Sequence, residues 1–250
     1  MAARTDHDER AEADAGAETA APKRRGASRL AMAVSILGEL LITAGVVLGL
    51  FVVYSLWWTN VVADRKADKQ GDKVRDNWAQ DKGGPGALDT KDGIGFLHVP
   101  SMKNGEVLVE KGTSTKVLND GVAGYYIDPV KATLPMTDKT GNFTLAAHRD
   151  GHGAKFHNID KIKKGDPIVF ETKDDWYVYK VFSILPETSK YNVKVLQSVP
   201  KQSGRTKPGH FITLTTCTPV YTSEYRYIVW GELERVQKVD SARTPPKELG

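Results

Sequence analysis

The sequence predicts an all-β domain of roughly 150 residues, a barrel or a sandwich, that follows one apolar helix near the N-terminus. Three observations lead to this prediction. Residues 30–58 form a long apolar segment, and no charged side chain occurs from Leu40 to Trp58. From Ile94 onward, short runs of β-branched, aromatic and other apolar residues follow one another. Turn-forming pairs such as Asp120-Gly121 separate the runs, and helical periodicity is scarce.

The apolar segment 30–58 has the length and composition of a transmembrane helix. Its uncharged part, Leu40 to Trp58, would extend ~28 Å as a helix, close to the hydrocarbon thickness of a bilayer. Trp57 and Trp58 stand at its far end, where aromatic rings favour the headgroup region. Glu39 falls at the cytoplasmic boundary if the span begins there, which avoids a carboxylate at mid-membrane.

Charge sets the predicted orientation of this anchor. Residues 23–29 carry four positive charges and should keep the N-terminus inside the cell. Residues 1–22 contain no aromatic residue and no Val, Leu or Ile, so 1–29 is predicted to be a disordered cytoplasmic tail with a basic end. A cleaved signal peptide is the alternative, since 61–63 resembles a cleavage site, but the apolar run is longer than a typical signal sequence. Everything after Trp58 is therefore predicted to be extracellular.

The extracellular part divides into three predicted segments. Residues 59–90 mix charges and end near a Gly-Gly-Pro-Gly cluster, which indicates a stalk or linker. Residues 91–240 form the β domain, and residues 241–250 a polar tail. Residues 157–165 are compatible with a short helical turn. The predicted strands are 94–100, 106–112, 142–148, 166–172, 175–186, 210–217 and 224–236.

Composition argues against several classes of partner and cofactor. The net charge of +4 is mild, and no basic stripe interleaved with aromatic residues is present, so no nucleic-acid partner is predicted. No glycine-rich phosphate loop appears, and no cofactor is predicted. His148 and His152 have a spacing seen in metal sites, but the pair spans a glycine-containing turn rather than a helix face, so no metal is predicted either.

Cys217 is the only cysteine of the chain. In an oxidising compartment structural cysteines normally occur as disulfide pairs, so a single one is either an intermolecular linker or a reactive group. A buried inert thiol is the other reading. A reactive cysteine acts as its thiolate and needs a basic or cationic neighbour.

Two further residues are candidates for such neighbours. His148 ends an apolar run and opens a turn, as Cys217 does, whereas His98 lies within a run and is interpreted as structural. Arg226 follows Cys217 after a short loop and shares a strand face with Ile228 and Trp230 by alternation. Such an arginine could stabilise an oxyanion. Arg149 and Arg205 are its rivals.

These residues belong to stretches that resemble the sortases, cysteine transpeptidases of Gram-positive cell surfaces. The matching stretches are GNFTLAAHRDG, TLTTCTP and SEYRYIVWG, with GFLHVPSM and FHNIDKIKKGDPIVFET beside them. The resemblance covers about residues 91–236 and implies a closed eight-stranded β-barrel. It also implies that Cys217 is the nucleophile, His148 the general acid and base, and Arg226 the oxyanion-stabilising or orienting group.

Within that family the sequence is most similar to the class E housekeeping sortases. This implies a membrane-anchored extracellular enzyme that cleaves a C-terminal sorting signal of the L-A-x-T-G or L-P-x-T-G type between Thr and Gly. The implied partners are surface proteins bearing the signal and an amine of a peptidoglycan precursor. Tyr125 stands where the family pattern leads us to expect a histidine, in a segment expected to border the peptide groove.

Three alternatives remain at the level of sequence. A pilin-polymerising sortase often carries a second transmembrane segment near the C-terminus, whereas the end of this chain is polar. A non-enzymatic barrel that binds cell-wall peptides would leave Cys217 inert. An L,D-transpeptidase also uses Cys and His, but its motif leading into Gly-Cys does not occur.

Overall fold

The computed structural model describes residues 28–80 and 93–250. The chain divides into two compact units, with the boundary between Leu48 and Gly49. Three predictions concern segments that fall wholly or mostly outside the described residues: the disordered tail 1–22, the basic cluster 23–29 and the Gly-Pro part of the linker before residue 91.

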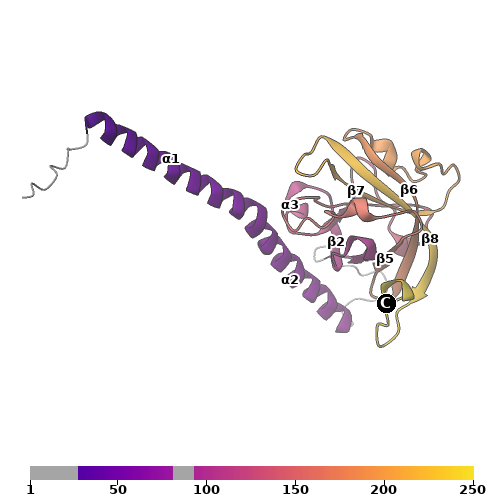
Figure 1. Cartoon of the computed structure of the whole chain (residues 1–250). Coiled ribbons are helices and arrows are strands. Elements are labelled where there is room, and N and C mark those ends of the chain that lie inside the picture. The colour runs from indigo at the N-terminus through magenta and orange to yellow at the C-terminus, as the bar shows by residue number, and fades with distance from the viewer. Residues whose placement is uncertain (1–27, 81–92) are drawn as a thin grey trace, which may run out of the picture. The chain divides into compact units, whose positions relative to one another are not determined.

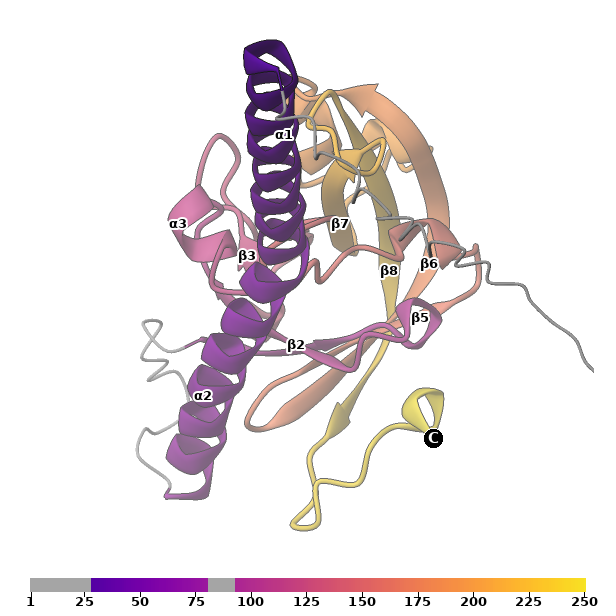
Figure 2. The same cartoon turned by 60° about the vertical axis from the view of Figure 1, so that its left-hand side comes forward.

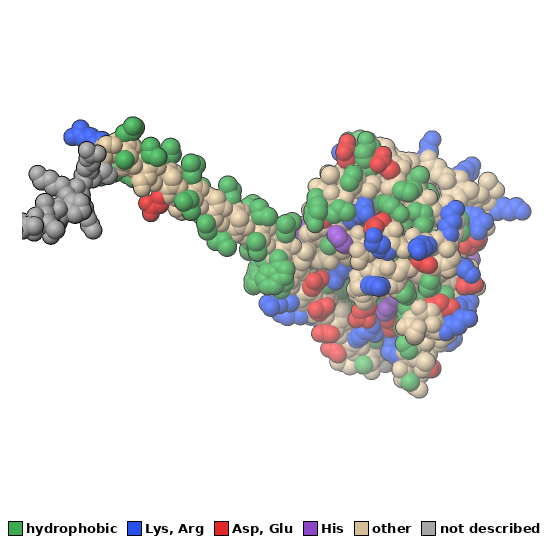
Figure 3. All heavy atoms as spheres, viewed as in Figure 1, with side chains coloured by type: hydrophobic (Ala, Val, Ile, Leu, Met, Phe, Trp, Pro, Cys, Tyr) green, Lys and Arg blue, Asp and Glu red, His purple; other side chains and the backbone are tan. Residues whose placement is uncertain are grey.

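The described N-terminal segment is helical without interruption. Helix α1 (Arg29–Val53) is followed by a π-helical turn, η1 (Tyr54–Trp58), and then by helix α2 (Thr59–Ala79). Most side chains of α1 are apolar and exposed, as the green spheres in Figure 3 show, and Glu39 is the acidic side chain among them. By length and composition this is a candidate membrane span, in agreement with the predicted apolar helix.

The C-terminal part of the chain forms a closed barrel of eight strands in the order β1-β2-β3-β4-β7-β8-β6-β5 (Figure 1). Two pairings are parallel, β2 with β3 and β4 with β7, and the others are antiparallel. The strands are β1 (Gly95–His98), β2 (Glu106–Lys111), β3 (Ala123–Tyr125), β4 (Gly141–Ala146), β5 (Pro167–Glu171), β6 (Asp175–Ser189), β7 (His210–Thr218) and β8 (Tyr225–Lys238).

Alternate residues of each strand fill the barrel. Leu145 of β4, Leu214 of β7 and Val229 of β8 are all fully buried in one apolar core. Their neighbours along the strands therefore face outward, because successive side chains of a strand point to opposite faces. This alternation fixes which polar side chains of the same three strands reach the outer surface of the barrel.

All seven strands expected from the sequence are present, and the eighth strand, β3, is the one that the residue pattern does not reveal. The fourth strand of the barrel ends at Ala146, so His148 lies just beyond the strand rather than within it. The expected turn in 157–165 is the 3-10 helix η4 (Ile159–Lys161). The short helix α3 (Thr115–Leu118) and six further 3-10 or π-helical turns complete the described elements: η1, η2 (Pro100–Met102), η3 (Pro135–Thr137), η5 (Val193–Leu196), η6 (Lys201–Ser203) and η7 (Lys247–Leu249).

Helix α2 packs on the outside of the barrel beside β2, as Figures 1 and 2 show from two directions. Its buried residues lie one turn apart and are mostly small: Ala63, Ala67, Gly71 and Val74. They allow a close approach, since a Cβ on Gly71 would lie 3.1 Å from the ring of Phe96. The segment that the sequence identifies as a stalk thus contributes part of its length to the packed unit.

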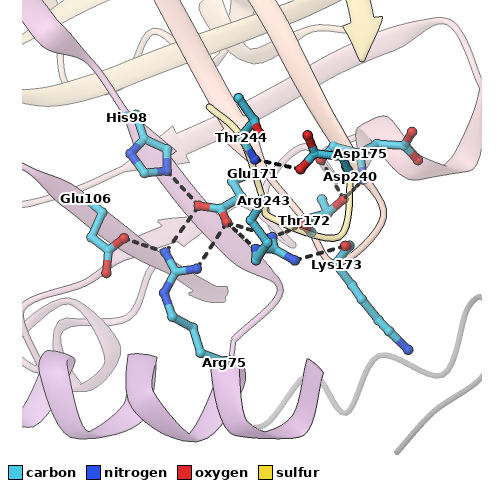
Figure 4. A network of polar contacts seen from close by, with 10 residues as sticks. All are labelled: Arg75, His98, Glu106, Glu171, Thr172, Lys173, Asp175, Asp240, Arg243 and Thr244. Atoms are coloured by element: carbon cyan, nitrogen blue, oxygen red, sulfur yellow. Dashed lines mark hydrogen bonds and ion pairs between the residues drawn. The ribbon is translucent and has the colours of Figure 1, made fainter. Parts of the chain in front are cut away.

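A buried carboxylate joins α2, the barrel and the C-terminal segment (Figure 4). Glu171, at the end of β5, is 2% exposed and is surrounded by three residues that donate hydrogen bonds to it. Arg75 of α2 donates at 3.1 Å, His98 Nε2 at 2.9 Å, and Arg243 at 2.6 Å. We call these four residues the Glu171 cluster. Burial alone raises the pKa of the Glu171 carboxyl, but the hydrogen bonds from His98, Arg75 and Arg243 outweigh it and hold the pKa at about 2.

We expect Glu171→Gln to lower the free energy of unfolding by about 3 kcal/mol, because it leaves the half-buried Arg243 guanidinium without its carboxylate partner and removes one of the two carboxylates that pair with Arg75. Glu106→Gln is the matched control, since Glu106 is 48% exposed and pairs only with Arg75 among the described residues, so a loss below about 1 kcal/mol is expected. Urea unfolding of the full chain in detergent measures both.

The same carboxylate gives the acid dependence of stability. Because its pKa is depressed in the folded state, its contribution is complete above the ordinary value of 4.5 and is lost as the pH falls through about 2. Equal losses for Glu171→Gln and Glu106→Gln, or wild-type stability that is flat over this window, would contradict the assignment.

Candidate active site

Cys217 lies near the end of β7 and faces Arg226 across the sheet. The two residues are direct partners in the antiparallel pairing of β7 with β8. Side chains at such positions have Cβ atoms roughly 5 Å apart, so the thiol and the guanidinium begin as neighbours. Both residues are half-buried, and Cys217 is a free cysteine.

Both side chains point to the outer face of the barrel. Leu214 of β7 and Val229 of β8 face the core, which places Cys217 and Arg226 on the other face by alternation. Ile228 and Trp230 share the face of Arg226, as the sequence predicts, and are fully buried beneath Val195 and Leu196 of the connection from β6 to β7.

His148 approaches the same place from β4. Strand β4 runs parallel to β7 with Ala146 beside Thr215, so the continued register places His148 alongside Cys217. The segment after the strand stays attached to β7: the Thr216 hydroxyl donates to the Ala147 carbonyl at 2.7 Å. The three predicted site residues therefore lie on, or two residues beyond, three strands that are adjacent in the barrel, β4, β7 and β8.

The imidazole of His148 is held by Asn119. The distance from His148 Nε2 to Asn119 Oδ1 is 2.8 Å. Since an amide oxygen only accepts, Nε2 carries the hydrogen in this contact, and Nδ1 of the neutral ring remains an acceptor. Burial lowers the pKa of His148, as does the nearby His152 ring, while Asp150 raises it. The ring is therefore mostly neutral at pH 7 and able to accept a proton.

Two arginines considered from the sequence as rivals of Arg226 have other contacts. Arg149 is 6% exposed, and its Nη1 donates to Thr218 Oγ1 at 2.8 Å and lies 3.5 Å from the Cys217 carbonyl. Arg149 directly follows His148, and its buried side chain thus ties this part of the chain to the end of β7. Arg205 forms an ion pair with Glu232.

Arg226 keeps donors free for a ligand. Its Nη1 donates to the carbonyls of Tyr225 at 2.9 Å and Ser223 at 3.2 Å. These bonds orient the guanidinium while Nε and Nη2 make no hydrogen bond within the described part of the chain. A planar group fixed at one corner is suited to donate to an oxygen that develops negative charge.

Two adjacent tyrosines at the end of β3 point in opposite directions, one into the core and one outward. Tyr125, in the segment expected to border a peptide groove, is buried in the barrel core. Tyr126 points outward, and its hydroxyl lies 3.0 Å from Thr215 Oγ1, two residues before Cys217 on the same face. Burial raises the pKa of the Tyr126 phenol.

One group of side chains among the described residues has ligand atoms close enough for a metal ion. It consists of His98, Glu106 and Glu171, whose ligand atoms lie within 4.8 Å of one another. Arg75 bonds both carboxylates, and Arg243 bonds Glu171. The positive charge that these acids require is thus supplied by guanidinium groups.

A thiol, an imidazole and a guanidinium at one edge of three adjacent strands define a candidate site for acyl transfer through a cysteine. The fold and the family model identify the class: the model described as Sortase domain matches residues 97–234, more than half of the chain. The chain belongs to the sortase family of cysteine transpeptidases.

Similar curated proteins place its homologues in class E. The chain is 71% identical to Sortase SrtE2 of Streptomyces coelicolor over the full length of both chains. It is 49% identical to Sortase SrtE1 of the same organism, over 79% of this chain and 56% of that protein. The names of both relatives carry the designation SrtE, in agreement with the resemblance seen in the sequence.

Solved structures show the same fold. Sortase E1 of Streptomyces coelicolor, crystallised with a tripeptide in the active site, is 47% identical, with a TM-score of 0.59 over 63% of this chain and 96% of that one. Sortase E of Streptomyces avermitilis is 30% identical, with a TM-score of 0.55 over 63% of this chain and 97% of that one. The barrel of the present chain is thus a sortase barrel.

Sequence reasoning misses one residue of the site region and the contacts of another. Asn119 caps the C-terminus of α3 and contacts His148, but the sequence shows it only as part of a turn. Arg149 was considered only as a rival of Arg226, and the sequence gave no sign of its bond to Thr218. The structure alone shows that the Arg149 side chain, next to His148, is buried.

Proposed function

We propose that this chain is a membrane-anchored extracellular transpeptidase in which Cys217, His148 and Arg226 are the catalytic residues. The observation that carries the proposal is the direct pairing of Cys217 with Arg226, with His148 following the adjacent parallel strand. Family membership supports the reaction type, and the apolar helix supports the anchor.

Under this proposal the substrate is a C-terminal sorting signal of the L-A-x-T-G or L-P-x-T-G type. The Cys217 thiolate attacks the carbonyl carbon between Thr and Gly, and Arg226 donates to the oxygen that becomes negative. His148 takes the thiol proton of Cys217 as the thiolate forms, and the C–N bond breaks as the resulting imidazolium gives that proton to the departing Gly amine. The products of this half-reaction are a thioester on Cys217 and a released Gly-terminated fragment.

The second half-reaction transfers the acyl group. An amine of a peptidoglycan precursor attacks the thioester carbon, His148 accepts the proton of that amine, and Cys217 leaves as a thiolate. The surface protein becomes joined to the cell wall by an amide bond. The proposed segments are a cytoplasmic tail 1–29, an anchor 30–58, a stalk or linker 59–90, a catalytic barrel 91–240 and a tail 241–250.

We expect the full chain in detergent to ligate triglycine to a peptide containing Leu-Ala-Gln-Thr-Gly, with cleavage after Thr. The measurement is mass spectrometry of the product, run in parallel with Leu-Pro-Gln-Thr-Gly and with a lysine ε-amine as acceptor. Faster ligation of the Leu-Ala peptide to triglycine supports the class E type of signal. Preference for the lysine acceptor would point to pilin polymerisation, and no product with any pair would contradict the proposal.

A further inference from the structure

Helix α2 contacts the two loops that hold His148, and these contacts lie at the end of α2 nearest the predicted membrane span. We propose that α2 is a positioning element for His148, so that the helix after the predicted anchor is part of the catalytic unit and more than a tether. This inference rests on the proposed role of His148. It follows from the packing of two glycines, from three polar contacts and from the attachment of the other end of α2.

The first step is the backbone packing of the turn after α3. Gly121 has φ +76°, and a Cβ on it would lie 2.8 Å from the Ala63 carbonyl oxygen of α2. Only glycine allows such an approach between a turn and a helix backbone. Two residues earlier in this turn stands Asn119, which holds His148 Nε2.

The second step is the loop that follows His148. Gly153 has φ +82°, and a Cβ on it would lie 3.0 Å from Asp64 Oδ1 and 3.2 Å from Gly121 Cα. The two loops therefore touch each other where both touch α2. Gly153 follows His152, whose ring centroid lies 5.5 Å from that of His148. Each of the two side-chain neighbours of His148 thus stands within two residues of a glycine packed on α2.

Polar contacts hold both loops to the helix. The Gly153 N–H donates to Asn60 Oδ1 at 2.8 Å, and Lys155 Nζ lies 2.9 Å from Asp64 Oδ1. Lys66 pairs with Asp120, the residue between Asn119 and Gly121, at 2.5 Å. Asn60, Asp64 and Lys66 lie within two turns of one another on α2, close to Ala63, which contacts the same loops.

The other end of α2 is fixed separately. Arg75 joins the Glu171 cluster, and the Trp78 ring packs edge-on against Phe96 with centroids 5.5 Å apart. A helix held at both ends on one barrel sets the position of the loops that contact its N-terminal end. The imidazole orientation is therefore built partly from residues that precede the barrel in the sequence.

The test is the double variant Asn60→Ala with Asp64→Ala in the full chain in detergent. We expect kcat for ligation of the Leu-Ala-Gln-Thr-Gly peptide to triglycine to fall on the order of 10-fold, because a misplaced His148 transfers protons less well. KM for the peptide should change by less than about 2-fold, since no peptide-binding group is removed. The conservative pair Asn60→Asp with Asp64→Glu keeps acceptor oxygens and should recover most of kcat.

The matched control is Asp72→Ala with Asp76→Ala, two exposed acids one turn apart on the same helix, which should leave kcat unchanged. Unchanged kcat in the Asn60 and Asp64 variant would overturn the inference. A loss of kcat equal to that of the control variant would also overturn the inference. The same holds for a loss of kcat that is fully explained by a smaller folded fraction in a thermal melt. Wild-type inactivity would instead count against the proposed function, which Cys217→Ala tests separately.

Discussion

Cys217→Ala is expected to abolish ligation, with product formation reduced by at least about 10⁴-fold, because no other nucleophile replaces the thiolate that carries the acyl group. Cys217 is the only cysteine in the chain, so no second thiol can substitute for it. The measurement is the initial rate of formation of the triglycine product from the Leu-Ala-Gln-Thr-Gly peptide, followed by mass spectrometry.

The control for this variant is its folding. Cys217 is half-buried near the end of β7, and its change to alanine removes one sulfur atom, so the melting temperature should stay within a few degrees of wild type. A thioester adduct of peptide mass should form on the wild-type chain and be missing from the variant. Ligation by Cys217→Ala at more than about 1% of the wild-type rate would remove the thiol from the mechanism.

The barrel strands were predictable from the sequence where they are long and apolar. Runs such as 166–172 and 210–217 pair β-branched residues with flanking turns, and both are strands of the structure. β3 was missed because it has three residues, Ala123 to Tyr125, and its central residue is glycine. Its place is fixed by pairing with β2 and β4, which is long-range information that a local pattern does not contain.

The candidate site residues were predictable for a related reason. Cys217 and His148 each follow an apolar run and precede a turn, so each was expected at an edge of the sheet. That the two edges coincide depends on the parallel pairing of β4 with β7, two strands far apart in the sequence. Asn119 could not be assigned for the same reason, since its contact with His148 joins separate segments.

The packing of α2 shows a second limit of pattern reasoning. The sequence analysis of residues 59–90 gave weight to charge and to glycine and proline, because apolar residues are sparse there. Burial instead falls on Ala63, Ala67 and Gly71, which contribute little apolar surface but permit a close approach. A stripe of small residues has a weak hydropathy signal, and its role becomes visible only when the opposing surface is known.

Arg226→Lys is expected to lower kcat/KM for the Leu-Ala-Gln-Thr-Gly peptide on the order of 100-fold, because an ammonium does not reproduce a planar group with several directed donors. In the structure Arg226 donates through Nη1 to the carbonyls of Tyr225 and Ser223. Its other nitrogens remain available to donate to a substrate bound at Cys217, its partner across the sheet. A lysine at this position retains the charge but loses the fixed plane and has one donor nitrogen in place of three.

The proper comparison is Arg205→Lys, the same chemical change at a rival arginine. Arg205 pairs with Glu232, whose partner across the sheet is Phe211, six residues before Cys217 on β7. Its substitution should leave kcat/KM within about 2-fold of wild type, since a solvent-exposed ion pair contributes little. Equal activity of Arg226→Lys and Arg205→Lys would show that charge alone suffices at this edge of the barrel. A loss confined to Arg226→Lys, at an unchanged melting temperature, would show that the geometry of the guanidinium stabilises the transition state.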